Sequence, residues 1–232
     1  MMNDKFITAI IVAAGNGSRM GTDVKKQFIM LDDKPILVYS IIEFLKSSYI
    51  DEVVLVTAKE DIDYCRKLLA RENISNVTIV AGGKTRQESV FCGLNGANKK
   101  TDIVLVHDGA RPFVKNLNLK ELIVQAIEHD SATFGVLPKD TIKLKNDNME
   151  IVETLDRNKL ILIQTPQAFS YNMLYLAHKK AQRNNYTGTD DTVLMDRYGA
   201  TTKVVEGSYY NIKITTKEDL DFAGVIKKKL EM

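Results

Sequence analysis

The sequence of 232 residues lacks the features that define several common classes of protein. Its 2 cysteines, Cys65 and Cys92, stand alone with no C-x-x-C spacing, which favours buried thiols in a reducing compartment over a disulfide or a metal site. No apolar run reaches the length of a membrane-spanning helix, and residues 1–5 lead directly into an apolar strand without a signal peptide. We therefore expect a cytoplasmic protein with no membrane partner.

The sequence also lacks a large excess of positive or negative charge. The 32 Lys and Arg residues are opposed by 30 Asp and Glu residues, so we expect no basic stripe for nucleic acid and no acidic tail. There is no internal repeat, no low-complexity stretch and no linker, which predicts a single domain over residues 1–232. None of the 3 histidines stands where a general base is expected, and His107 fits a packed strand-end side chain better than a base.

What the chain does contain is an apolar strand that leads into a glycine-rich loop. Residues 8–21 read TAIIVAAGNGSRMG, and the β-branched run within them predicts a buried strand. Gly15 and Gly17 let the backbone approach a ligand closely, and amide N–H groups in such a loop can converge on phosphate oxygens. Arg19 and Lys26 supply cations that can reach the same anion. The pattern predicts a nucleoside triphosphate at the carboxyl end of the first strand.

Two other glycine-rich motifs do not fit this loop. A P-loop requires a Lys-Ser or Lys-Thr pair at a spacing that is absent here. A dinucleotide-binding G-x-G-x-x-G motif requires glycine where Met20 stands, and the strand expected at 51–57 ends without an acid for a ribose. A dinucleotide-dependent oxidoreductase is therefore disfavoured.

Strand and helix patterns alternate through the first 140 residues. We expect strands at 51–57, 77–80, 103–106 and 132–137, and helices at about 59–71, 85–98 and 117–129. Short connections between alternating units predict a Rossmann-like α/β fold, in which helices cover both faces of a mostly parallel sheet. Such sheets bind ligands at the carboxyl ends of their strands.

The alternation breaks at about 139–156. This polar segment predicts two short strands around a turn at 146–148. A hairpin with so little apolar surface is marginal alone. We expect a protruding arm that lies against its own domain or against a second subunit.

Candidates for chemistry follow two of the expected strands. Asp108 can hold a divalent cation or a ribose hydroxyl, and Arg111 can grip a phosphate through two hydrogen bonds. An Asp–Arg ion pair that only braces the loop is the alternative. Gly83 precedes the N-terminus of an expected helix, where free N–H groups attract anions. A glycine turn with an ordinary cap from Thr85 explains the same residues.

Three further motifs lie in the last third of the chain. The sequence QTPQAF at 164–169 follows an apolar strand expected at 160–163. The TDD sequence at 189–191 opens an expected helix, which capping alone can explain. Lys213 is expected on a short strand, either as a ligand-binding cation or as a surface lysine. The sequence TKED at 216–219 predicts a capping box for the last helix.

Taken in order, these motifs resemble the 2-C-methyl-D-erythritol 4-phosphate cytidylyltransferase family across essentially the whole chain. The matching segments are A-A-G-x-G-x-R-M-G, K-Q, G-G-x-x-R-x-x-S-V, H-D-x-A-R-P, D-T-I-K, D-R, Q-T-P-Q-x-F, T-D-D and N-I-K-I-T. Gly109 departs from the family, which commonly has alanine there. Ribitol 5-phosphate cytidylyltransferases share the phosphate loop and Q-T-P-Q, so that acceptor is the main alternative. A non-catalytic nucleotide-binding regulatory module is a further one.

The resemblance implies a role for each matched position. The catalytic residues would be Arg19, Lys26 and Lys213. Those that line the CTP would be Ala13, Ala14, Gly15, Gly17, Gly83, Lys84 and Ser89. Those that bind the sugar-alcohol phosphate would be Asp108, Arg111, Thr141, Arg157, Thr165 and Thr189. Asp108 would also hold Mg²⁺, and the arm of the second subunit in a homodimer would deliver Thr141 and Arg157.

The implied reaction transfers the cytidylyl group of CTP to the acceptor phosphate and releases pyrophosphate, a step of non-mevalonate isoprenoid biosynthesis. It needs no side-chain base because a phosphomonoester already carries nearly two negative charges at neutral pH. The obstacle is the repulsion between two polyanions, which cations must offset.

Overall fold

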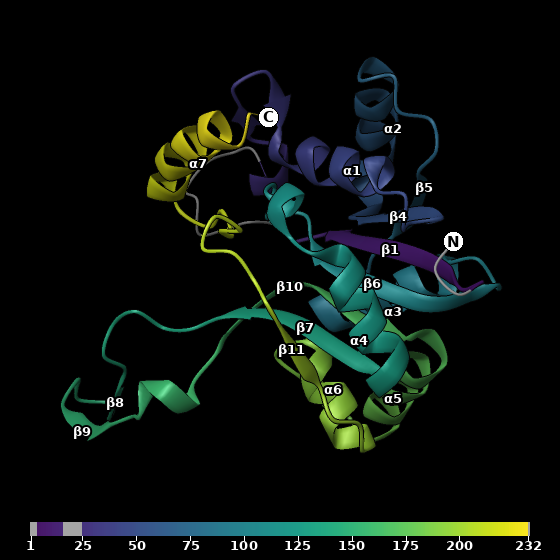
Figure 1. Cartoon of the computed structure of the whole chain (residues 1–232). Coiled ribbons are helices and arrows are strands. Elements are labelled where there is room, and N and C mark those ends of the chain that lie inside the picture. The colour runs from purple at the N-terminus through teal and green to yellow at the C-terminus, as the bar shows by residue number, and fades with distance from the viewer. Residues whose placement is uncertain (1–3, 16–24, 232) are drawn as a thin grey trace.

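The computed structural model describes residues 4–15 and 25–231, and a central sheet runs through them (Figure 1). Within these residues the sheet has seven strands, in the order β11-β7-β10-β6-β1-β4-β5. Their bounds are β1 Phe6–Ala13, β4 Glu52–Thr57, β5 Thr78–Ala81, β6 Thr101–Asp108, β7 Ser131–Val136, β10 Leu162–Ser170 and β11 Lys203–Glu206. β10 runs antiparallel to its neighbours β6 and β7, and the other pairs are parallel. The expected mostly parallel sheet is confirmed.

Helices cover both faces of this sheet (Figure 1). Their bounds are α1 Ile36–Lys46, α2 Ile62–Arg71, α3 Arg86–Gly96, α4 Leu119–His129, α5 Tyr171–Arg183, α6 Asp191–Tyr198 and α7 Lys217–Leu230. Apolar side chains of α1, α2 and α4 pack on one face, and those of α3, α5 and α6 pack on the other. α7 packs against a smaller cluster that includes Leu31 and Ile36. Leu31 belongs to the short hairpin of β2 Met30–Leu31 and β3 Lys34–Pro35.

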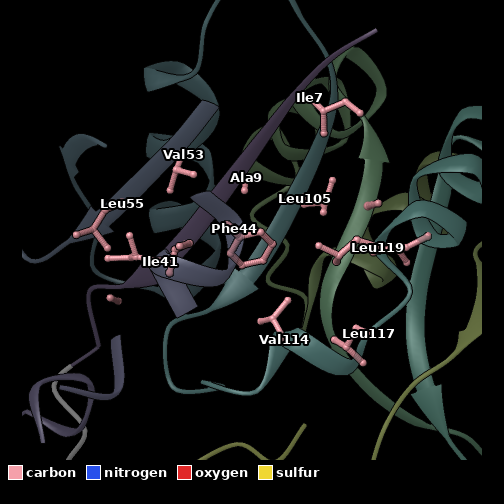
Figure 2. Close-up of a cluster of buried hydrophobic side chains, with 14 of the residues drawn as sticks. Ile7, Ala9, Ile41, Phe44, Val53, Leu55, Leu105, Val114, Leu117 and Leu119 are labelled. Carbon is pink, nitrogen blue, oxygen red and sulfur yellow. The ribbon is translucent and has the colours of Figure 1, made fainter. Parts of the chain in front are cut away.

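β1 illustrates why the inner parallel strands are largely apolar. Alternate side chains of a strand point to opposite faces. Ile7 and Ala9 therefore join the cluster that also contains Phe44 of α1, and Figure 2 shows Ala9 next to Phe44, while Ile10 joins the cluster beneath α3. Because both faces are covered, β1 reads as a continuous apolar run rather than an alternating one.

The expected strands and helices of the first 136 residues are confirmed, with shifts of a few residues at their ends. The expectation for QTPQAF was wrong. β10 does not end before this motif but continues through it to Ser170. Proline is tolerated there because its register with β7 shifts between Ile163 and Gln167, so the ladder does not need an N–H from Pro166.

Lys213 does not lie on a strand, contrary to expectation. Residues 211–215 form an extended segment outside the sheet ladders. Its position is set by Ile214, which is buried and donates from its N–H to the carbonyl of Ala110 at 2.9 Å. This bond brings the segment to the loop that follows β6.

The hairpin in the polar segment is confirmed. β8 Lys143–Lys145 pairs with β9 Ile151–Thr154 in antiparallel register, and both strands are exposed along their length. In Figure 1 this arm extends well away from the central sheet. It leaves from the carboxyl end of β7, which is the edge of the sheet where β1 and β6 also end.

Both cysteines are free thiols; Cys65 is buried as expected, whereas Cys92 is only half-buried. Among the residues that the structure describes, no helix combines the length and the apolar character needed to cross a bilayer.

Candidate active site

A cleft lies at the carboxyl ends of β1 and β6 and beside the N-terminus of α3. Its volume is about 230 Å³. The predicted site residues along its wall are Ala13, Ala14, Gly15, Lys26, Gly83, Lys84, Ser89, Asp108 and Lys213. Lys213 comes to this cleft from the second half of the sequence, on the segment that the Ile214–Ala110 hydrogen bond attaches to the loop after β6.

The base of the phosphate loop is held by Gln27. This side chain is buried, and its amide Nε2 donates to the carbonyls of Ala13 at 2.8 Å and Gly15 at 3.1 Å. The Gln27 side chain thus connects the backbone after the glycine-rich segment to Ala13 and Gly15 before it. Gln27 belongs to the K-Q motif, and the sequence alone predicts no role for it. Gly17 and Arg19 lie outside the described residues.

The Gly82–Gly83 turn forms the opposite wall of the cleft. A β-carbon on Gly82 would lie 2.7 Å from Ala14 Cβ and 2.8 Å from Ser89 Oγ, so glycine is needed for this close approach. The Ser89 hydroxyl accepts from Gly83 N at 3.2 Å and donates to the Thr85 carbonyl at 2.8 Å. Ser89 therefore shapes the turn itself.

The N-terminus of α3 is capped within the chain. Thr85 accepts from Glu88 N at 3.1 Å, which confirms the expected cap. The backbone N–H of Lys84 donates to Glu88 Oε2 at 2.6 Å. The cap and the cleft are thus built from the same turn.

Asp108 is the acidic centre of the cleft. Its Oδ2 accepts from Lys213 Nζ at 2.6 Å, and its Oδ1 accepts from Arg86 Nε at 3.1 Å. Burial alone would raise the pKa of this carboxyl, but Arg86 and then Lys213 hold it well below its ordinary value. Asp108 is therefore ionised at neutral pH.

Arg86 is a site residue that the sequence analysis missed. It was quoted only as part of a helix-start motif, yet its Nη1 also donates to Asp191 Oδ2 at 2.7 Å. Asp191 comes from the TDD sequence and is buried. An arginine in the first turn of a helix next to a Gly-Gly turn was the available signal, but its two acidic partners are 22 and 105 residues away.

Arg111 lies beside the acidic centre without pairing with it. Its Nη1 donates to the Asn211 carbonyl at 2.6 Å. The loop-bracing Asp108–Arg111 ion pair considered from the sequence is therefore replaced by pairs from Asp108 to Arg86 and Lys213.

His107 is a packed side chain, as expected. It is fully buried, with its ring 5.1 Å from that of Phe44, and burial lowers its pKa to about 4. Its Nε2 lies 2.9 Å from the Arg111 carbonyl, and its Nδ1 lies 3.2 Å from Thr165 Oγ1. Thr165 in turn accepts from the backbone N–H of Asp108 at 3.0 Å.

The remaining predicted residues lie outside the wall of this cleft. Thr189 is exposed and directly precedes Asp190, which is the residue that caps α6 by accepting from Val193 N at 3.1 Å. Thr141 and Arg157 lie at the base of the arm, where Arg157 Nη1 donates to the Lys139 carbonyl at 2.8 Å. The described residues that were predicted to line the nucleotide therefore share one cleft, and the arm residues do not join them.

A mostly parallel sheet with helices on both faces and a cleft at the carboxyl ends of its strands defines a Rossmann-like α/β protein, a class that binds ligands at this edge of the sheet. The family model for 2-C-methyl-D-erythritol 4-phosphate cytidylyltransferase matches residues 7–229. The chain belongs to this family.

Individual relatives agree with that assignment. The chain is 44% identical over 224 residues to the 2-C-methyl-D-erythritol 4-phosphate cytidylyltransferase of Clostridium botulinum (strain ATCC 19397 / Type A), covering 96% of this chain and 98% of that one. It is 46% identical over 225 residues to that of Clostridium novyi (strain NT), covering 96% and 97%. The crystal structure of 4-diphosphocytidyl-2C-methyl-D-erythritol synthase from Anaerococcus prevotii DSM 20548 matches with a TM-score of 0.85 at 32% identity, covering 98% of both chains.

Proposed function

We propose that this chain transfers the cytidylyl group of CTP to 2-C-methyl-D-erythritol 4-phosphate, giving 4-diphosphocytidyl-2-C-methyl-D-erythritol and pyrophosphate. Membership of the family supports the reaction. The single structural observation that carries it is the grouping of Lys26, Lys213 and Asp108 on one cleft at the carboxyl end of β1. In this proposal a triphosphate and a second phosphate would meet at the positive charge of the two lysines.

The reaction is an in-line displacement at the α-phosphorus of CTP. An oxygen of the acceptor phosphate forms the new P–O bond, and the bond between the α-phosphorus and the bridging oxygen breaks to release pyrophosphate. No proton has to be removed, since the attacking phosphate is already anionic at neutral pH. His107, buried and neutral, is in keeping with a mechanism without a histidine base.

The cations offset the repulsion between the two reactants. Lys26 begins a short helical turn, and Lys213 lines the same cleft from the segment that follows β11. In this proposal they, with Arg19, stabilise charge that develops on the α-phosphate and on the departing pyrophosphate. The Lys213–Asp108 pair keeps the ammonium at the cleft before substrates arrive.

Asp108 is the candidate ligand for Mg²⁺. The described residues contain no group of three or more His, Cys, Asp or Glu side chains that would enclose a metal. Mg²⁺ in nucleotide enzymes is commonly held by one or two carboxylates together with substrate phosphates, so a single ionised carboxylate on the cleft fits. When bound there, the ion would neutralise phosphate charge. The protein's part is to present Asp108 ionised and oriented.

The arm would complete the acceptor side in a homodimer. Its exposed apolar residues include Met149 at 73%, Ile151 at 67% and Val152 at 61% of their full accessibility, which favours burial against another surface. Thr141 and Arg157 flank this hairpin and would reach the cleft of the second subunit. Sedimentation of the purified chain in dilute solution tests the dimer.

The reaction itself is tested by measuring pyrophosphate release from CTP with 2-C-methyl-D-erythritol 4-phosphate or D-ribitol 5-phosphate as acceptor. We expect release only with the first at comparable concentrations. A preference for ribitol phosphate would overturn the proposed acceptor. CTP binding without release for either compound would instead indicate a regulatory nucleotide-binding protein.

A further inference from the structure

A chain of charged and polar side chains continues behind the cleft from Asp108. Arg86 from α3 bridges Asp108 and Asp191, through Nε at 3.1 Å and Nη1 at 2.7 Å. Asp191 is the first residue of α6, and its Oδ1 lies 3.1 Å from Nε2 of His178 on α5. Neither Asp191 nor His178 lines the cleft. The proposed reaction gives neither of them a role.

Because these charged groups are buried, their desolvation costs free energy, and the cluster is not explained by stability alone. Asp191 and His178 are each 1% exposed. Buried ion pairs are often no more stabilising than apolar side chains of similar size, because removing charge from water is expensive. The fixed geometry of the carboxylates is therefore the more informative property of the cluster.

The imidazole of His178 has one defined hydrogen-bonding role. Its Nδ1 is buried, and none of the described residues forms a hydrogen bond with it. A proton on Nδ1 would be a buried donor without an acceptor, so the favoured tautomer carries its proton on Nε2 and donates to Asp191. The ring also stacks on Phe91, with centroids 6.0 Å apart.

The guanidinium of Arg86 can donate to Asp108 and Asp191 at the same time, which a lysine ammonium would do less well. A guanidinium donates along several fixed directions in one plane, whereas an ammonium is a point charge on a flexible stem. The neighbouring Gln87 fastens the same segment, since its Nε2 donates to the Tyr186 carbonyl at 3.0 Å and its Oε1 accepts from Gly188 N at 2.9 Å. The first turn of α3 thus holds the start of α6 at several points.

We infer that His178, Asp191 and Arg86 are positioning residues that orient the Asp108 carboxylate for the metal-bound nucleotide. His178 holds the Asp191 carboxylate through a hydrogen bond, and Asp191 in turn orients the guanidinium of Arg86. Arg86 then donates a hydrogen bond to Oδ1 of Asp108. The other carboxylate oxygen, Oδ2, then faces Lys213 and the cleft. The inference rests on the proposed function. Partners that orient a ligating carboxylate typically change metal affinity or activity by about 10–100-fold when they are removed.

Arg86→Lys is the first variant, because it keeps the charge and removes the bridge. Calorimetric titration with CTP and Mg²⁺, without acceptor, should show binding about 10–100-fold weaker than in the native chain. The rate of pyrophosphate release should fall by a similar factor. Native affinity together with a native rate would overturn the inference.

His178→Phe and His178→Gln form a matched pair. Phenylalanine keeps the ring packing but cannot donate to Asp191, while glutamine can place a donor near the position of Nε2. We expect about 10-fold weaker binding of CTP with Mg²⁺ in the phenylalanine variant and binding within about 3-fold of native in the glutamine variant. Equal losses in both, following their melting temperatures, would show a merely structural role.

A complementary measurement separates this inference from the proposed reaction. Because the calorimetric readout needs no acceptor, the order of affinities among these variants can hold even if neither acceptor supports turnover. In that case the reaction would be wrong while the positioning role stands. Full turnover in all three variants would refute the positioning role and leave the reaction intact.

Discussion

The cleft and the arm are built in opposite ways, although both lie at the carboxyl edge of the same sheet. Around the cleft, Asp108 contacts Arg86 and Lys213, which lie 22 and 105 residues away in the sequence, and the Gln27 side chain is buried. Along the arm, β8 and β9 are exposed throughout and form a separate two-stranded sheet in which they pair only with each other. Under the proposed function, one protomer would form the nucleotide side, whereas the acceptor side would need a second surface.

Removing a cation from the cleft should have the largest effect. We expect Lys26→Ala and Lys213→Ala each to lower kcat by at least about 100-fold, the scale of losing one donor that stabilises the transition state. Lys100→Ala, at an exposed lysine away from the cleft, is the control and should change kcat little. Near-native turnover in Lys213→Ala would remove that residue from the mechanism and weaken the contrast with the arm.

Lowering the pH should have the second-largest effect, because burial of His107 makes the folded chain less stable in acid. The pKa of His107 falls from an ordinary 6.5 to about 4 on burial, so the unfolded chain binds more protons between these values. The free energy of unfolding should therefore drop by about 2 kcal/mol from this group as the pH falls from about 7.5 to 4.5. Urea unfolding at both pH values, compared with His107→Gln, measures it. A pH dependence as steep in the variant would show that His107 is not its source.

A change on the arm should affect one substrate only. Arg157→Ala is expected to raise the KM for the acceptor about 10-fold, the scale of one charge-assisted phosphate contact, and to leave the KM for CTP nearly unchanged. Steady-state kinetics with each substrate varied in turn gives both values. Equal changes in the two constants would contradict the division between the cleft and the arm.

The central sheet could be predicted from the sequence because apolar periodicity and turn residues are local signals. β10 was missed in part because buried polar residues such as Gln164 and Gln167 do not read as a strand, and because Pro166 argues against one. Their burial is explained by distant partners. Gln164 donates to the Ser208 carbonyl, and Gln167 donates to Asp190.

The candidate site was predictable to the extent that single residues stand next to strand ends. Asp108, the last residue of β6, carries that signal, whereas Lys26 was predicted from its place after the glycine-rich sequence. Arg86 and Asp191 carry no such signal, because their importance depends on a meeting of α3 with α6 that no local pattern encodes. Gln27 was visible in a motif, yet its role depends on a three-dimensional return to the carbonyls of Ala13 and Gly15.

Replacing Gly109 should have the smallest effect, and it tests packing and acceptor choice separately. It does not line the cleft, and its N–H donates to the Val12 carbonyl at 2.9 Å. A β-carbon there would lie 2.9 Å from Leu37 Cδ1 and 3.2 Å from Ala13 Cβ, so a buried side chain must shift slightly. Gly109→Ala should therefore cost about 1 kcal/mol of unfolding free energy, as mild overpacking does.

The same variant should keep the acceptor preference of the native chain, because the added methyl group faces α1 and β1 rather than the cleft. Thermal unfolding and a competition assay with the two sugar-alcohol phosphates measure the two effects separately. If Gly109→Ala changed the preferred acceptor, the loop after β6 would take part in acceptor selection. The nucleotide side and the acceptor side would then overlap within one protomer, and the arm would no longer be the main determinant of the acceptor.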